Sequence, residues 1–147
     1  MAINVVGFEN VQFVDFNPDP ASGVPNDLFL ITGVALIQPF TGTAGNQGGW
    51  TRDTCSFDVP TPDGQPFLFS GGDVSASALV VPATVQNVGS EDIGFGVDNV
   101  SAVVSEPVNM QKQRKVTLTA RVVVRDTKGA IFRLGFQANV LARTPVQ

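Results

Sequence analysis

The chain has 147 residues, of which 43% are hydrophobic and 15% are charged, and its formal net charge is −4. This length fits one domain, and the composition is typical of a folded globular protein rather than a disordered one. The chain has one cysteine and no histidine or tyrosine. These counts exclude an internal disulfide, a thiolate zinc cluster and catalysis by serine–histidine or cysteine–histidine pairs. We therefore expect one domain over residues 1–147, with no enzymatic activity and no cofactor.

Runs rich in Val, Ile, Phe and Thr alternate along the chain with clusters of Gly, Pro, Asn and Asp, and helical periodicity is nearly absent. This pattern predicts an all-β domain of about eight or nine strands. We expect a single antiparallel β-sandwich of jelly-roll or Greek-key type. The predicted strands are residues 3–6, 10–15, 28–38, 53–59, 66–69, 74–85, 94–104, 114–125 and 130–142.

The N-terminal residues lack the basic and apolar regions of a signal peptide, and no apolar run is long enough to cross a membrane as a helix. We therefore expect neither a classical signal peptide nor a transmembrane segment, and no membrane partner. The sequence leaves the location open, with a virion as one interpretation.

Residues 15–27, DFNPDPASGVPND, place oxygen-bearing side chains at alternate positions, as calcium loops do. The sixth and twelfth positions lack the glycine and glutamate of the helix-loop-helix calcium loop, and two prolines stiffen the segment. We favour a proline-rich turn between strands and predict no metal site. A calcium loop of a β-protein remains the alternative, with Asp15, Asn17, Asp19 and Asp27 as its oxygen donors.

Residues 28–38, LFLITGVALIQ, are apolar on both faces of the predicted strand. In a two-layer fold, the outer face of such a strand is covered only if it packs against another subunit. The Gly-rich segment 39–52 follows and ends near Trp50, the only tryptophan. We interpret Trp50 as a contact residue of an interface or ligand site, with a packing role as the alternative.

Acidic residues offer little for catalysis. Asp53 and Asp58 are separated by an odd number of positions, so an unbroken strand directs them to opposite faces. Glu91 and Asp92 lie in a polar, turn-like stretch, where we expect them to be solvated. In the predicted strand 94–104, the alternation of apolar residues changes phase at Asp98, which predicts a β-bulge at that position.

Residues 114–143 are interpreted as a β-hairpin closed by a loop at 127–129, with Gly129 as a bulge. In that register every pair on one face is apolar, whereas a shift by one residue mixes apolar and polar positions. The predicted pairs are Val124 with Phe132, Val122 with Leu134, Ala120 with Phe136, Leu118 with Ala138, and Val116 with Val140. The opposite face of the hairpin is then polar and basic, with Lys115, Arg121 and Arg125 on one strand beside Arg133 on the other.

Charge is distributed unevenly along the sequence. Residues 1–106 contain twelve acidic side chains and one basic one, while residues 107–147 contain eight basic side chains and one acidic one. Because the whole chain is acidic and no lysine- or arginine-rich arm is present, we do not expect nucleic acid as a partner. The basic strands either neighbour acidic strands of the same sheet or meet the acidic part of another copy.

Together these features favour a structural subunit of a larger symmetric assembly, such as a phage capsid decoration protein or another virion protein. The alternative is a carbohydrate- or ligand-binding β-sandwich module, with or without calcium. We expect a homo-oligomer or other subunits of an assembly as partners. The expected assembly contacts are Lys115, Arg121, Arg125, Arg133 and Trp50.

Overall fold

The computed structural model describes residues 2–16, 26–42, 49–70, 74–87, 94–125 and 128–143. These residues form seven strands and no helix, so the predicted all-β class is confirmed, whereas about eight or nine strands were expected. Accordingly, the described residues contain no helix that could span a membrane. The strands are β1 (Val5–Phe16), β2 (Asn26–Thr41), β3 (Trp50–Asp58), β4 (Val74–Asn87), β5 (Gly94–Val104), β6 (Val116–Arg125) and β7 (Gly129–Arg143).

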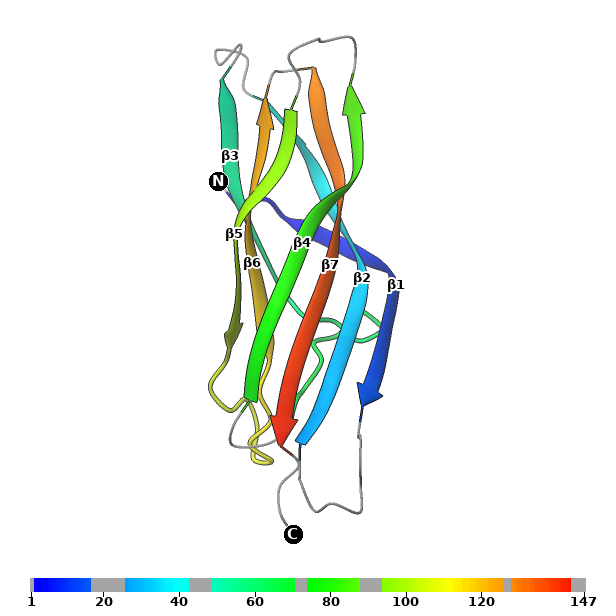
Figure 1. Cartoon of the computed structure of the whole chain (residues 1–147), viewed down its shortest axis with the longest axis vertical. Coiled ribbons are helices and arrows are strands. Elements are labelled where there is room, and N and C mark those ends of the chain that lie inside the picture. Colours follow the sequence, from blue (N-terminus) through cyan, green and yellow to red (C-terminus); the bar gives the residue numbers. More distant parts are fainter. Residues whose placement is uncertain are drawn as a thin grey trace.

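The strands form two antiparallel sheets (Figure 1). A four-stranded sheet has the order β1-β2-β7-β4, and a three-stranded sheet has the order β3-β6-β5. Aromatic rings join the two sheets across a shared apolar interior. The ring of Phe57 on β3 lies 5.2 Å from that of Phe136 on β7 and 5.7 Å from that of Phe8 on β1, measured between ring centroids. The two sheets therefore bury their inner faces against each other.

The hairpin predicted for residues 114–143 is wrong. β6 pairs with β3 and β5, whereas β7 pairs with β2 and β4, so the two strands belong to different sheets. Most of their apolar residues nevertheless line the same interior from opposite sides, while Val123 of β6 and Leu141 of β7 point outward. Two strands with alternating apolar residues have the same sequence pattern whether they pair with each other in a hairpin or face each other from two packed sheets. The sequence pattern therefore does not distinguish these two arrangements.

The two predicted strands 3–6 and 10–15 fall within one strand, β1, apart from Ile3, which forms an isolated bridge with Cys55. The register of β1 against β2 shifts between Glu9 and Gln12, where Asn10 has a φ of 56°. This irregularity accounts for the break in the apolar pattern. The predicted strand 66–69 is not a strand and forms only isolated bridges.

The bulge predicted near Asp98 is confirmed. The register of β5 against β6 shifts between Asp98 and Ser101, and Asn99 has a φ of 53°. Asparagine adopts this left-handed conformation more readily than most residues. The bulge keeps Val97 and Ala102 directed toward the interior, although five positions separate them.

Residues 59–70 cross from the three-stranded sheet to the four-stranded sheet and carry part of the core. The rings of Phe67 and Phe69 stack with their centroids 4.5 Å apart. Phe29 of β2 lies 5.5 Å from Phe69, and Phe13 of β1 lies 5.6 Å from Phe67, both measured between ring centroids. This irregular segment is thus held by aromatic packing and by isolated backbone bridges rather than by a continuous strand.

Candidate functional site

The outer face of the three-stranded sheet collects most of the predicted contact residues. Because Cys55, Leu118 and Ala120 point inward and are buried, the residues that alternate with them point outward. Trp50 lies opposite Arg125, which lies opposite Gly94 on the far strand. We call this surface the arginine face, and it comprises Trp50, Arg52, Thr54, Ser56, Asp58, Gly94, Gly96, Asp98, Lys115, Thr117, Thr119, Arg121, Val123 and Arg125.

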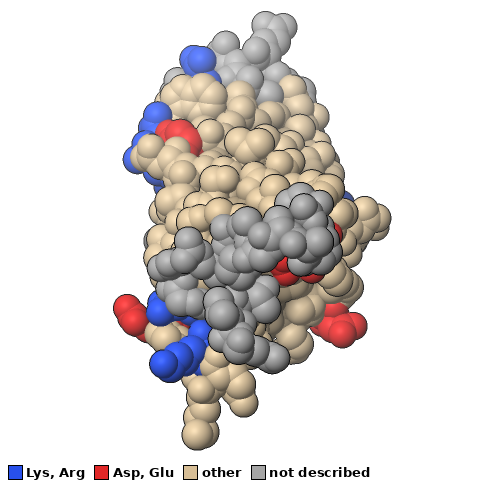
Figure 2. Space-filling model, turned by 60° about the horizontal axis from the view of Figure 1, so that its bottom comes forward, with Lys and Arg blue, Asp and Glu red and all other residues tan. Residues whose placement is uncertain are grey.

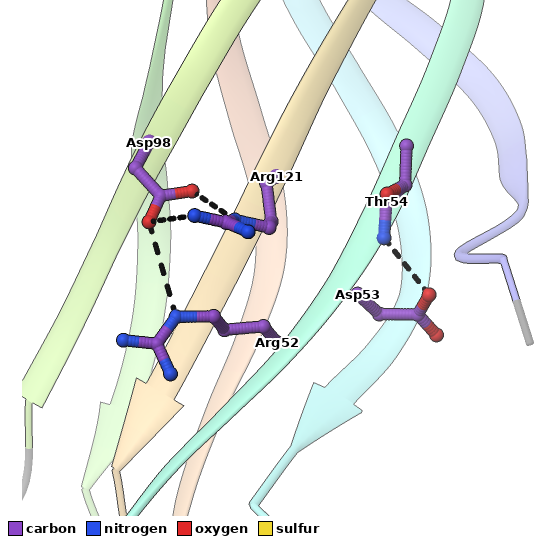
Figure 3. Close-up of polar contacts among 5 residues, drawn as sticks. All are labelled: Arg52, Asp53, Thr54, Asp98 and Arg121. Carbon is purple, nitrogen blue, oxygen red and sulfur yellow. Dashed lines mark hydrogen bonds and ion pairs between the residues drawn. The ribbon is translucent and has the colours of Figure 1, made fainter.

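Asp98 joins two of the arginines at the centre of this face (Figure 3). The Arg121 Nε and Nη2 atoms donate to the two carboxylate oxygens of Asp98 at 2.5 and 3.1 Å. Arg52 approaches the same carboxylate, with its Nε atom 3.9 Å from Oδ2. The hydrogen bond from Arg121 is the main reason why the pKa of Asp98 lies below its ordinary value, and it raises the pKa of Arg121. The Asp98 carboxylate thus interacts with two guanidinium groups, so the cluster of Asp98, Arg52 and Arg121 has a net positive charge.

Trp50 reaches across β6 to the position of Gly94 on β5. A Cβ atom added at Gly94 would lie only 2.5 Å from the Cη2 atom of the indole. The ring therefore occupies space that is open because residue 94 has no side chain. Trp50 is 40% exposed, so the indole presents part of its surface to solvent beside Arg125.

The arginine face contains other local charge pairs. Lys115 Nζ lies 3.3 Å from Asp58 Oδ2, and Thr117 donates its hydroxyl hydrogen to Asp58 Oδ1 at 2.8 Å. Basic residues therefore neighbour acidic residues of the same sheet, as one of the two charge interpretations predicts. Such exposed pairs stabilise a fold only slightly, so they do not prevent a second contact by the same side chains.

Arg133 lies on the other side of the molecule. It extends from β7 on the outer face of the four-stranded sheet, where its Nε atom is 3.5 Å from Oε2 of Glu9. The prediction that Arg133 shares one basic face with Arg121 and Arg125 is wrong, because β6 and β7 belong to different sheets. Four of the five predicted contact residues thus share a face, and Arg133 does not.

The outer face of the four-stranded sheet, which we call the apolar face, exposes large hydrophobic side chains. We consider the part of this face that lies level with Gly7 to Phe16 of β1. Among its described outward side chains, Glu9 and Arg133 are the charged ones, and they form an ion pair with each other. Leu79 is 61% exposed and Val81 is 55% exposed. The other large apolar side chains of this face that are at least two-fifths exposed are Val14, Phe16, Leu28 and Leu141.

The sequence predicts the apolar residues of β2 on this face but not those of β4. The sequence indicates that β2 is apolar on both sides, and the outward Leu28 and the inward Ile31 agree with that interpretation. Leu79 and Val81 of β4 were not singled out. The run Leu79-Val80-Val81 could have identified them, because consecutive apolar residues occupy both faces of a strand, as they do in β2.

The calcium interpretation rests on four residues, of which Asn17 and Asp19 lie outside the described residues. Asp15 and Asp27 are described, at adjoining ends of β1 and β2. Partial burial raises the pKa of Asp15, and the negative charge of Asp27 raises it further. The described part of the chain contains no group of three or more residues of the kinds that bind metals.

Cys55 is buried, and burial raises the pKa of its thiol to about 11. The thiolate is therefore scarce at neutral pH, and Cys55 is a small core residue rather than a reactive thiol. Asp53 and Asp58 point to opposite sides of β3, as their spacing predicts, while Glu91 and Asp92 lie outside the described residues. Asp53 and Asp58 therefore do not converge on one site.

Comparison with protein family models, with curated proteins and with solved structures gave no match for this chain. The function is therefore inferred from the two outer faces alone. One face is basic and contains a partly exposed indole, while the other is nearly uncharged and exposes large apolar side chains among uncharged polar ones.

Proposed function

We propose that this chain is a non-enzymatic structural subunit of a larger symmetric assembly, such as a capsid decoration protein or another virion protein. Its two sheets then form a β-sandwich of jelly-roll or Greek-key type. The observation that carries the proposal is the apolar face, where six large hydrophobic side chains are at least 41% exposed. Monomeric soluble proteins rarely expose a large contiguous apolar patch, and such patches commonly mark interaction sites.

The low charge of the surface supports the same function. In the view of Figure 2, charged side chains form small separate groups, and uncharged residues cover most of the described surface. Charged residues are depleted in the cores of protein interfaces, whereas Trp and Arg are enriched in interfaces. The arginine face has both of these residue types, in Trp50 and Arg125.

The arginine face suits an acidic neighbour. Arg52, Arg121 and Asp98 together retain a positive charge, and Arg125 lies one row away. Complementary charge of this kind directs the orientation of a partner more than it adds affinity. We therefore propose Trp50, Arg121, Arg125 and Lys115 as contacts with an acidic surface, and Arg133 as a contact of the apolar face.

Sedimentation velocity over a wide range of protein and salt concentrations tests the proposal. We expect a mass that increases with protein concentration and an association of the wild-type chain that weakens at high salt. The variant Arg125→Glu should associate more weakly than wild type at low salt, and this difference should shrink at high salt because salt screens the added repulsion. Lys112→Glu is the matched control, because Lys112 is exposed in the loop before β6 and lies outside the arginine face. A strictly monomeric mass at every concentration, with no partner captured by the wild-type chain, would contradict the proposal.

A ligand-binding module is the second candidate, and it is favoured by the position of Trp50. The partly exposed indole lies over Gly94 beside the Arg125 guanidinium, an arrangement that suits stacking against a sugar ring with a hydrogen-bond donor nearby. Trp50 fluorescence should then respond to members of a glycan panel. If calcium supports the module, a chelator should also lower the melting temperature. The absence of both responses would remove this candidate.

A further inference from the structure

A ridge and a hollow lie side by side on the apolar face. Leu79 and Val81 form the ridge, and they extend from β4, which hydrogen-bonds to β7 in the four-stranded sheet. The hollow has a volume of about 280 Å³ and is lined by Thr32, Gly33, Leu79, Val81, Gly135, Phe136 and Gln137. Ridge and hollow are thus neighbouring parts of one surface.

Gly135 gives the hollow its depth. Gly135 lies between Val34 of β2 and Val81 of β4 in one row of the sheet, at a position where side chains point outward. A Cβ atom placed there would lie 3.4 Å from Cγ2 of Val81, and no side chain fills the row between the two valines. Because the floor is backbone and the wall is apolar, the hollow suits a hydrophobic side chain of moderate size.

We propose that a second copy of this chain docks on the apolar face about a two-fold axis, so that Leu79 and Val81 of each copy enter the hollow of the other. This inference rests on the proposed function and specifies its first contact. In a two-fold interface the same surface meets itself, so a ridge must lie beside a hollow that accepts it. The apolar face has this arrangement.

The charge of the face agrees with a second copy as the occupant. Among the described outward side chains of this face, Glu9 and Arg133 are the charged ones. They already form an ion pair with each other within one chain. A strongly charged partner would find no complementary charge there and would lose solvation. A second copy brings the same nearly uncharged surface.

The size of the face is also adequate. The face spans all four strands of the sheet. Along the strands it extends from the Gly7–Leu36 pair to the Phe16–Leu28 pair. With a strand spacing of about 4.8 Å and a rise of about 3.3 Å per residue, the face measures about 20 by 30 Å, or about 600 Å² in projection. Side chains enlarge the accessible area beyond this projection, which brings it close to the roughly 800 Å² per partner of a standard interface.

Sedimentation equilibrium of Leu79→Lys provides the first test. A lysine at this position would be forced into the hollow of the partner, so we expect the dimer dissociation constant to rise by at least about a hundredfold. Val103→Lys is the matched control, because Val103 is 56% exposed and points outward from β5 on the opposite side of the molecule. The control should change the dissociation constant by less than about threefold.

Cross-linking provides a second test that does not depend on a destabilising variant. Gln137 points outward next to the hollow, so Gln137→Cys should form a disulfide-linked dimer under mild oxidation. Ser56→Cys on the arginine face should not, and the native Cys55 is buried and should not interfere. If wild type associates but Leu79→Lys associates equally well and Gln137→Cys gives no dimer, the inference is wrong and the proposed function stands. A wild-type chain that remains monomeric and binds no partner overturns the proposed function as well.

Discussion

The two outer faces differ in how they treat apolar side chains at equivalent positions. Val123 points outward from the centre of the three-stranded sheet, yet it is only 9% exposed. Val81 points outward from the four-stranded sheet and is 55% exposed. Val123 lies on the central strand β6 between Arg52 and Gly96, whereas Val81 lies on the edge strand β4 and pairs with Gly135. Long side chains can cover apolar surface with their aliphatic stems, but glycine cannot.

This contrast shows that the pattern of one strand does not decide whether an outward valine is protected from water. The side chains on the adjacent strands decide it, together with whether the strand lies at the centre or at the edge of its sheet. The arginine face covers Val123, whereas the apolar face leaves Val81 open to solvent. The following experiments compare matched positions on the two faces.

The largest expected difference concerns Val123 and Val81. Val123→Ala removes two methyl groups from a nearly buried site and should lower the free energy of unfolding by about 1–2 kcal/mol. Val81→Ala acts at an exposed position and should change the stability of the monomer by less than about 0.5 kcal/mol. Denaturant unfolding at low protein concentration measures both values. Equal losses would mean that the two faces do not differ in self-coverage.

Gly94 and Gly135 provide the second comparison. Gly94→Ala places a methyl group where the Trp50 ring lies, so we expect the indole to be displaced, with a cost of about 0.5–1.5 kcal/mol. Gly135→Ala meets its nearest neighbour at an ordinary contact distance of 3.4 Å and should have a smaller effect. Tryptophan fluorescence should shift to longer wavelength in the Gly94 variant only. An unchanged emission maximum would contradict the observed packing of the indole against Gly94.

The pH dependence of stability should differ between Asp98 and Asp15. The pKa of Asp98 is lowered by its hydrogen bond from Arg121, so its stabilisation is present above the ordinary value of 3.8 and is lost as the pH falls through the lowered pKa. The pKa of Asp15 is raised by burial and by Asp27. Its ionisation therefore weakens the fold as the pH rises through the raised value.

At neutral pH, Asp98→Asn should lower the melting temperature and Asp15→Asn should raise it. Both differences should disappear in strong acid, where the native carboxyl groups are protonated too. Thermal melts between about pH 2 and about pH 7 measure the effect. The same sign for both substitutions at neutral pH would be inconsistent with the opposite pKa shifts.

The smallest effects are expected for the exposed ion pairs that occur on both faces. Lys115→Gln breaks the pair with Asp58, and Arg133→Gln breaks the pair with Glu9. Each should cost the monomer less than about 1 kcal/mol, because exposed pairs gain little in water and are screened by salt. Melts with and without added salt test this expectation. A loss at Arg133 that increases with protein concentration would instead indicate a role of Arg133 in association.

Several features of the fold could be predicted because they depend on neighbouring residues in the sequence. The all-β class follows from alternation and turn residues, and the bulge near Asp98 follows from a local change of phase. The two-sided apolar character of β2 also follows from its own residues. In contrast, residues 59–70 resemble a strand in part but are held by the rings of Phe67 and Phe69, which contact residues distant in sequence.

For strands that alternate simply, such as β6 and β7, the sequence by itself determined which side faces the core, because alternation with a period of two is a local property. It did not determine which strands pair. Apolar residues on β6 and β7 satisfy the core equally well as a hairpin and as members of two facing sheets. Only the tertiary structure placed β6 between β3 and β5 and β7 between β2 and β4. That choice separated Arg133 from Arg121, brought Trp50 over Gly94, and left Leu79 and Val81 beside an open hollow.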